Sequence, residues 1–300
     1  MFKITKDILK KVYPPRPVDC HKYDYGLLLV VGGGDFYTGS PALSSLAAFR
    51  AGVDMVHILA PQRAANTIAG FSPNLAAYPF KGEWFDNEDL STLLAFTESA
   101  QTVAHDKTAI VIGGGMGRSP ETKAAILDYL RQAPNIKAVI DADGIHAVSP
   151  VRGAGASNGV SQNISAVQGR TFIFTPHSFE FLVLTGRDIR DARFEEKVKA
   201  VQEEAARLGG VIVLKGPQDI VSDGKEVAID ETGSPYMTVG GTGDTLAGIA
   251  GSLLAQGIAP FLAAQGASYI NGRAGEMAAK KLGAGMTATD LIEMIPEVIR

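Results

Sequence analysis

The sequence has a single cysteine, Cys20, and no excess or clustering of basic residues. One cysteine cannot form an intrachain disulfide and provides no thiol cluster for zinc, which favours a reducing, cytoplasmic compartment. The 28 lysine and arginine residues are outnumbered by 32 aspartate and glutamate residues, giving a net charge of −4. The chain therefore lacks the basic surface that nucleic-acid binding requires, and a small-molecule partner is favoured instead.

Charged residues are also missing between Thr245 and Gly272, a run long enough to span a bilayer. Pro260 divides this run into two helical pieces of ordinary buried length, so we expect two core helices and no membrane association. The N-terminal stretch "MFKITKDILKK" alternates charged and apolar residues. This pattern predicts a small amphipathic helix and not a secretory signal.

Short β-rich runs alternate with helical patterns along the chain, which predicts βαβ units and a mainly parallel sheet. At 300 residues with 46% hydrophobic content, we expect one large α/β domain over residues 1–300. Residues 149–170 are rich in Gly, Ser and Asn and are expected to form a surface excursion. The expected strands are residues 27–33, 53–60, 108–114, 137–143, 171–177 and 211–216; the expected helices include 41–52, 119–133 and 194–210, and a hairpin is expected over 219–230.

The stretch "TVGGTGDTLAG" combines clustered glycines with one carboxylate, Asp244, before the uncharged run. Glycines let the backbone approach an anion closely, and the first amides of the following helix point toward it. A carboxylate beside an anion site would repel phosphate, unless it takes a proton from a hydroxyl that attacks a phosphoryl group. Asp244 could equally be a helix cap, and spacing does not decide between these roles.

Several motifs carry a resemblance that covers nearly the whole chain. "GGTGDTLAG" resembles the anion-hole and catalytic-base motif of the ribokinase-like superfamily. The other segments are similar to the NAD(P)H-hydrate dehydratase family within it; they are "PPRPVDCHKYDYGLLLVVGGG", "YTGSPALSSLAAFRAG", "DADGIHAV", "TPHSFEF", "VIVLKG" and "GSPYMTVGGTGDTLAG". The resemblance implies a ribokinase-like three-layer α/β/α sandwich with a mainly parallel central sheet.

The resemblance also implies a reaction. Such enzymes phosphorylate the C6 hydroxyl of (6S)-NADHX or NADPHX from ADP or ATP, with Mg²⁺, and phosphate then leaves to regenerate NADH or NADPH. The nucleotide product is AMP from ADP or ADP from ATP, and similarity to stand-alone microbial members favours ADP. The family implies a homo-oligomer, often a tetramer. We expect a separate NAD(P)H-hydrate epimerase to act with it, because the chain does not contain that domain.

The site residues that the resemblance implies are carried over by position. Asp244 would be the base, and the amides of Gly241, Thr242 and Gly243 would surround the transferred phosphoryl group. The remaining assignments are Ser40, Gly115, His177 and Asp244 for the hydrate; Lys215, Gly216, Pro217, Gln218, Asp219 and Gly243 for the nucleotide; and Glu180 and Asp141 for magnesium, directly or through water.

Each of these side chains also has a purely structural interpretation. His177 could only shape its turn, and Lys215 could extend to solvent. Glu180 could sit in the first turn of a helix, and Asp141 could brace a turn. The sequence also departs from the family pattern at Ser40, Gly114, Gly144 to His146, and Ser178-Phe179.

Phe179 is the departure with the clearest chemical consequence. It puts a phenyl ring beside His177 where the family commonly has glycine, which would reshape the pocket for the hydroxyl acceptor and leave the anion-hole motif unchanged. The alternative enzyme is a ribokinase-like kinase of a small alcohol, such as a thiamin precursor, that releases its phosphorylated product. A non-catalytic nucleotide sensor is a further alternative, but it would not need Asp244.

Overall fold

Ten strands form one mixed sheet in the computed structural model, which describes residues 1–133, 135–149 and 167–300. Their order is β1-β10-β9-β8-β7-β6-β5-β2-β3-β4. From β8 to β4 all neighbours are parallel, whereas β9 is antiparallel to both β8 and β10. The strands are β1 Phe2–Lys3, β2 Leu27–Val31, β3 Met55–Pro61, β4 Ala76–Phe80, β5 Thr108–Ile112, β6 Lys137–Ile140, β7 Phe172–Phe174, β8 Val211–Leu214, β9 Asp219–Ser222 and β10 Val227–Asp230.

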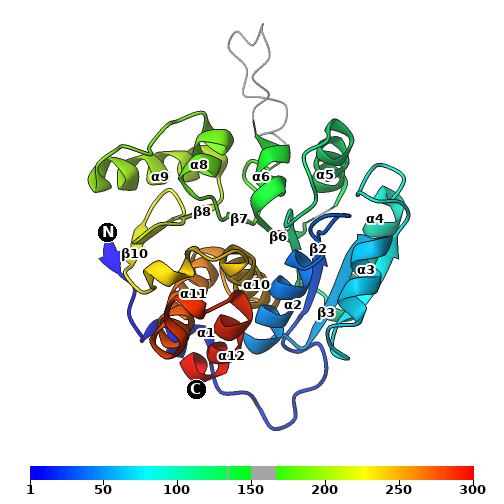
Figure 1. Ribbon diagram of the computed structural model, residues 1–300, viewed down its shortest axis with the longest axis horizontal. Helices are drawn as coiled ribbons and strands as arrows, with labels where there is room; N and C mark the ends of the chain where they lie inside the picture. The colour runs from blue at the N-terminus through cyan, green and yellow to red at the C-terminus, as the bar shows by residue number, and fades with distance from the viewer. Residues whose placement is uncertain (134, 150–166) are drawn as a thin grey trace, which may run out of the picture.

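Helices cover both faces of this sheet, which gives three layers (Figure 1). Alternate side chains of β2 enter different cores, with Leu28 and Val30 on one face and Leu27, Leu29 and Val31 on the other. The first core also contains residues of α1 Ile8–Val12, α2 Ser40–Arg50, α3 Gln62–Ala69, α10 Thr242–Ala255, α11 Pro260–Leu282 and α12 Ala288–Ile299. The second contains residues of α4 Leu90–Ala104, α5 Pro120–Gln132, α6 Ala142–Val148, α8 Ser178–Thr185 and α9 Phe194–Leu208.

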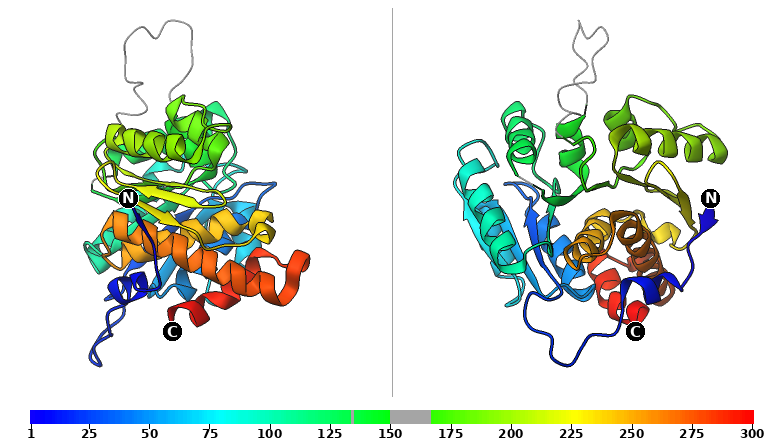
Figure 2. Two further views of the ribbon diagram at one scale, coloured as in Figure 1. Left: turned by 90° about the vertical axis from the view of Figure 1, so that its left-hand side faces the viewer. Right: turned by 180° about the vertical axis from the view of Figure 1, so that it is seen from behind.

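The expected three-layer α/β/α architecture with a mainly parallel sheet is confirmed, and each expected strand overlaps an observed one. Four residues separate the end of α10 from Pro260, which begins α11, so the uncharged run forms two helices as expected. No helix in the described part of the chain combines the length and apolar character that crossing a bilayer requires. The two views in Figure 2 show the layers edge-on and from behind.

One expectation differs from the structure, and another falls mostly outside the described residues. The N-terminal stretch does not begin as a helix: Phe2 and Lys3 form β1 beside β10, and the helix starts only at Ile8. The Ile4 amide continues this pairing by donating to the Ile229 carbonyl over 2.8 Å, so backbone pairing with a sheet edge outweighs helix formation here. Most of the expected excursion, residues 150–166, lies outside the described residues. Short helices η1 Pro235–Thr238 and η2 Gly283–Gly285 complete the fold.

Candidate active site

The glycine-rich turn before α10 is fixed by close packing. Gly241 has φ +98°, and a Cβ there would lie 2.6 Å from Leu43 of α2 and 2.9 Å from Ala288 of α12. The Thr242 hydroxyl closes the turn by donating to the Met237 carbonyl over 2.7 Å. The first amides of a helix have no partner within the helix and carry its positive dipole end. The turn thus holds the first backbone donors of α10 in a fixed arrangement, which is the geometry that an anion site requires.

Asp244 follows this turn in the first turn of α10, and its carboxylate meets α2. The Ser40 hydroxyl donates to Asp244 Oδ1, and the Ser44 hydroxyl donates to the Asp244 carbonyl over 3.0 Å. Burial raises the pKa of Asp244 to about 7; the negative charge of Asp141 adds to this, while the Ser40 hydrogen bond and Lys215 oppose it. Among the described residues, the hydrogen bond to this carboxylate comes from Ser40 and not from a helix amide, so capping does not explain its position.

Gly114 provides the space in which Ser40 and Asp244 meet. A Cβ at Gly114 would lie 2.2 Å from Ser40 Oγ and 2.9 Å from Asp244 Oδ1. Its neighbour Gly115 has φ +69° and packs against Tyr37. The glycine cluster after β5 therefore forms one wall beside Asp244, as its place at a strand end predicted.

Lys215 lies between two buried carboxylates, Asp141 directly after β6 and Glu180 in the first turn of α8. Its Nζ is 3.2 Å from Asp141 Oδ1 and 3.6 Å from Glu180 Oε2. A Cβ at Gly243 would come within 3.4 Å of the same Nζ, so the ammonium also borders the glycine-rich turn. Burial alone would lower the pKa of Lys215, but the surrounding carboxylates outweigh burial and raise it. Lys215 is therefore a positively charged group beside the anion-binding turn and does not extend to solvent.

His177 forms the N-cap of α8 together with Glu180. The ring Nδ1 accepts from the amides of Phe179 and Glu180 over 3.1 and 3.3 Å, and Glu180 Oε2 accepts the His177 amide over 2.9 Å. The other ring nitrogen, Nε2, lies 3.5 Å from Glu180 Oε1. Because Nδ1 is an acceptor, a neutral His177 carries its proton on Nε2. Phe179 stacks on this imidazole and is 47% exposed, so the departure from glycine adds an aromatic surface beside His177.

The four residues after Lys215 differ in their exposure to solvent. Gly216, Pro217 and Gln218 are exposed, whereas the Asp219 carboxylate turns back to accept the Gly216 amide over 3.0 Å. Burial raises the pKa of Asp219 to about 6. Its carboxylate is thus engaged within the protein, while the preceding backbone is available to a ligand.

The two expected magnesium residues, Asp141 and Glu180, both contact Lys215, whose single positive charge offsets part of their negative charge. Asp141 Oδ1 accepts the Thr175 hydroxyl over 2.6 Å in addition to the Lys215 contact. In the part of the chain that the structure describes, no group of three or more His, Cys, Asp and Glu side chains is arranged to hold a metal. A cation here would need further ligands from a substrate and water.

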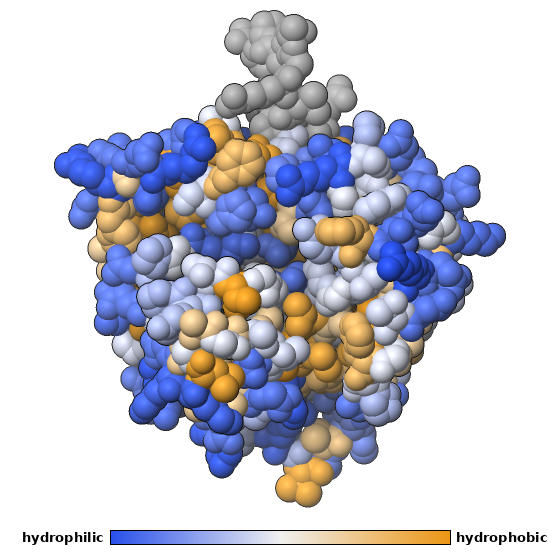
Figure 3. Space-filling model, in the orientation of Figure 1, coloured by the Kyte–Doolittle hydropathy of each residue, from blue (hydrophilic) through white to orange (hydrophobic). Residues whose placement is uncertain are grey.

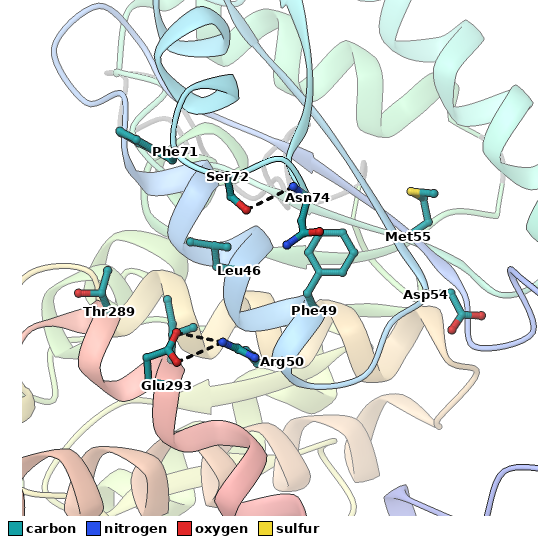
Figure 4. Close-up of a pocket in the computed structure, with 11 residues that line it drawn as sticks. Leu46, Phe49, Arg50, Asp54, Met55, Phe71, Ser72, Asn74, Thr289 and Glu293 are labelled. Carbon is teal, nitrogen blue, oxygen red and sulfur yellow. Dashed lines mark hydrogen bonds and ion pairs between the residues drawn. The ribbon is translucent and has the colours of Figure 1, made fainter.

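The described residues also enclose a groove of about 680 Å³ elsewhere, between α2, α12 and residues 71–74 (Figure 4). It includes Asp54 and Met55 at the start of β3, whereas the glycine turns follow the ends of strands. An Arg50–Glu293 ion pair crosses it. On the face shown in Figure 3, hydrophobic side chains form separate patches among hydrophilic ones. Because the groove includes the start of β3 and the glycine turns follow the ends of strands, the groove is separate from the candidate site.

Sequence reasoning missed Thr175, Asp230 and Ser268, which hold the charged groups of the site in place. Thr175 begins the "TPHSFEF" motif at the end of the expected strand 171–177, so its place at a strand end could have identified it as a site residue. Asp230 ends the expected hairpin opposite Asp219, and pairing the hairpin ends would have found it. Ser268 gave no local signal because it approaches from α11, far along the chain.

Comparison with known proteins agrees with this geometry. The family model described as NAD(P)H-hydrate dehydratase matches residues 28–297. The bifunctional NAD(P)H-hydrate repair enzyme Nnr of Pyrobaculum aerophilum is 40% identical over 95% of this chain, which spans only 52% of that relative. The ADP-dependent (S)-NAD(P)H-hydrate dehydratase of Cenarchaeum symbiosum is 34% identical, and the match covers 99% of this chain and 96% of that protein.

The fold has its own match among solved structures. A ribokinase-like superfamily protein from Enterococcus faecalis superposes with a TM-score of 0.81 at 25% identity, covering 100% of this chain and 95% of that one. The first curated relatives are about twice as long as the present chain, which covers 50 to 54% of their lengths. The family model over residues 28–297 and the relative that matches over nearly its full length place this chain in the NAD(P)H-hydrate dehydratase family of ribokinase-like proteins.

Proposed function

We propose that this protein repairs hydrated nicotinamide coenzymes. It would phosphorylate the hydroxyl of (6S)-NADHX or NADPHX from ADP or ATP and then release phosphate to regenerate NADH or NADPH. The observation that carries the proposal is Asp244, a carboxylate with a pKa of about 7 that sits between the Ser40 hydroxyl and the glycine-rich turn. The names of the curated relatives supply the substrate class.

In this proposal Asp244 takes the proton of the substrate hydroxyl as it attacks the terminal phosphoryl group. A base with a pKa near the working pH is partly ionised yet basic enough to accept that proton. The amides of Gly241, Thr242 and Gly243 would hold the transferred phosphoryl oxygens, and Lys215 would offset their charge. The phosphorylated hydroxyl is then a good leaving group, and the lone pair of the ring nitrogen drives its expulsion.

The acidic side chains fit a magnesium ion only in part. A phosphoryl-transfer magnesium is typically held by one or two carboxylates, with phosphate and water as the other ligands. Asp141 and Glu180 could supply those carboxylates, although Lys215 lies between them. When bound, the ion would neutralise charge on the nucleotide phosphates. The roles proposed for Asp244 and Lys215 do not depend on where the magnesium ion would lie.

Further features belong to the proposal. We propose that residues 1–300 act as one ribokinase-like domain, since β1 pairs with β10 within the same sheet as all other strands. An NAD(P)H-hydrate epimerase would supply the S epimer, a partner activity suggested by the name bifunctional NAD(P)H-hydrate repair enzyme of the curated relatives. We also propose a homo-oligomer, a tetramer as the family resemblance implies, and a cytoplasmic location, where the nicotinamide coenzymes are used.

The direct test is incubation of the protein with NADHX or NADPHX and either ADP or ATP. Recovery of dihydronicotinamide absorbance together with free inorganic phosphate supports the dehydratase. A phosphorylated alcohol without phosphate release would instead identify a kinase of the same fold. Comparing the two nucleotides at equal concentration also measures which one is preferred.

The pKa of Asp244 predicts the pH dependence of turnover. A protonated Asp244 cannot accept the substrate proton, so turnover at saturating substrates should rise with pH and level off above pH about 7. Ser40→Ala removes a hydrogen bond that lowers this pKa, so the rising limb should move to higher pH. Identical profiles for the wild type and Ser40→Ala would show that the limb belongs to another group.

His177→Ala should weaken use of the hydrate more than it weakens nucleotide binding. His177 caps α8 beside the exposed Phe179, so its loss disturbs the aromatic side of the site while the Gly241 turn remains intact. Calorimetry with ADP and the Michaelis constant for the hydrate measure the two effects separately. Equal losses of nucleotide and hydrate affinity would contradict the placement of His177 on the hydrate side of the site.

A further inference from the structure

Two aspartates face each other at the open end of the β9–β10 hairpin. Asp219 and Asp230 are direct partners in the antiparallel register. Like charges in this position repel each other. Asp230 is only 1% exposed, so water offers little screening. The pair therefore needs hydrogen-bond donors or a proton.

Ser268 of α11 bridges the two carboxyl groups. Its Oγ lies 2.7 Å from Asp219 Oδ2 and 3.0 Å from Asp230 Oδ2. A hydroxyl has one hydrogen and two acceptor sites, so it donates to one carboxylate and can accept from the other only if that carboxyl is protonated. Both contacts are therefore full hydrogen bonds when one of the two carboxyl groups is protonated and the other is ionised.

The surrounding charges do not neutralise the pair. Burial raises the pKa of Asp219 to about 6 and also raises that of Asp230, with Glu276 adding to the second effect. Lys215 acts in the opposite direction on Asp219 but is held by other carboxylates. The ionisable groups that face the pair or flank it are Lys215 after β8, Lys3 of β1, Glu231 after β10, and Tyr269, Arg273 and Glu276 of α11.

The pair joins two loops beside the proposed nucleotide site. Asp219 Oδ1 accepts the Gly216 amide over 3.0 Å and so shapes the exposed backbone after Lys215. Asp230 accepts the amide and the hydroxyl of Thr232 over 3.3 and 2.7 Å. Thr232 begins the segment that leads through η1 to the glycine-rich turn. Loosening the pair would therefore affect both loops at once.

We propose that Asp219, Ser268 and Asp230 form a proton-sharing bridge that holds these two loops in the conformation that receives the nucleotide. These are positioning residues, since they act through the Gly216 and Thr232 backbone and do not touch the phosphoryl group. The role as a nucleotide-positioning bridge rests on the proposed function. The shared proton does not, because it concerns contacts within the protein.

The presence of the shared proton is tested by measuring the melting temperature of the protein at different pH values. An aspartate whose folded pKa is raised binds its proton more tightly when folded, so its contribution to stability falls as pH rises from about 4 to about 6. Asp230→Asn replaces one acid with a neutral amide that can still donate to Ser268. We expect this variant to melt about 2 to 6 °C above the wild type at pH 7.5, with the difference disappearing toward pH 4.

The positioning role is tested with ADP alone as the probe. Ser268→Ala leaves the two carboxyl groups without their bridge, and we expect ADP affinity measured by calorimetry to fall about three- to tenfold at pH 7.5. Ser252→Ala is the matched control, because Ser252 is also a buried serine but lies in α10. This variant should bind ADP as the wild type does. Asp230→Asn should lose less ADP affinity than Ser268→Ala.

Two results would overturn the inference. A melting difference between Asp230→Asn and the wild type that is the same at all pH values would rule out a shared proton. Unchanged ADP affinity in a folded Ser268→Ala variant would rule out the positioning role. Neither measurement uses the hydrate, so failure here is distinguishable from failure to regenerate NADH.

Discussion

Asp244→Asn should reduce turnover by about two to four orders of magnitude while the protein stays folded. Asparagine preserves the size of the side chain and can accept the Ser40 hydroxyl, but it cannot take a proton from the substrate. Nucleotide affinity should be retained, because removing a negative charge beside the phosphates relieves repulsion and the amides of Gly241 to Gly243 remain. Turnover at saturating hydrate and nucleotide, measured beside the thermal midpoint, provides the test.

The alternative role of Asp244 makes the opposite prediction. If it were only a helix cap, asparagine would cap about as well, and both stability and turnover would stay near wild type. A folded Asp244→Asn variant that binds nucleotide and turns over within about threefold of wild type would contradict the base assignment. Asp244→Ala is a useful companion because it also removes the Ser40 hydrogen bond.

Lys215→Ala should raise the Michaelis constant for the nucleotide and also destabilise the fold. Removing the ammonium leaves Asp141 and Glu180, both buried, without their shared partner. Breaking a buried ion pair from one side typically costs about 3 to 5 kcal/mol, and the lower end suits a lysine whose side chain is 22% exposed. A rise of about tenfold or more in the nucleotide constant is expected, since a charge-assisted contact is lost.

Two comparisons separate charge from fold in this prediction. Lys215→Arg retains the positive charge and should recover part of the stability. Lys199→Ala removes an exposed lysine paired with Glu203, and it should change stability by less than about 1 kcal/mol. An unchanged nucleotide constant in a folded Lys215→Ala variant would leave Lys215 with only a structural role.

The parallel strands could be predicted because burial on both faces makes them continuously apolar, as in Leu27–Val31. β4 was missed, because it is an edge strand that contains Pro79 and alternates between exposed and partly buried residues. The first residues were predicted as helix because their pattern is locally amphipathic, while the pairing of β1 with β10 joins the two ends of a long chain segment.

The candidate site shows the same division between local and long-range information. The glycine-rich turn is a local pattern, so its place at the start of α10 could be predicted. The Ser40–Asp244 and Ser268–Asp230 contacts join residues from distant parts of the sequence, and no spacing rule reveals them. The carboxylate of Asp219 is directed to Gly216 and Ser268 inside the protein, and contact of this residue with the nucleotide stays a prediction.

In the proposed reaction, phosphorylation of the C6 hydroxyl precedes and enables its loss. The most direct test of this order follows NADH, inorganic phosphate and AMP together when the wild-type protein acts on NADHX with ADP. We predict equal amounts of all three products, no NADH without nucleotide, and almost none of the three with Asp244→Asn. NADH recovery that does not require nucleotide, or AMP formation with a stable phosphorylated product and no NADH, would contradict the account.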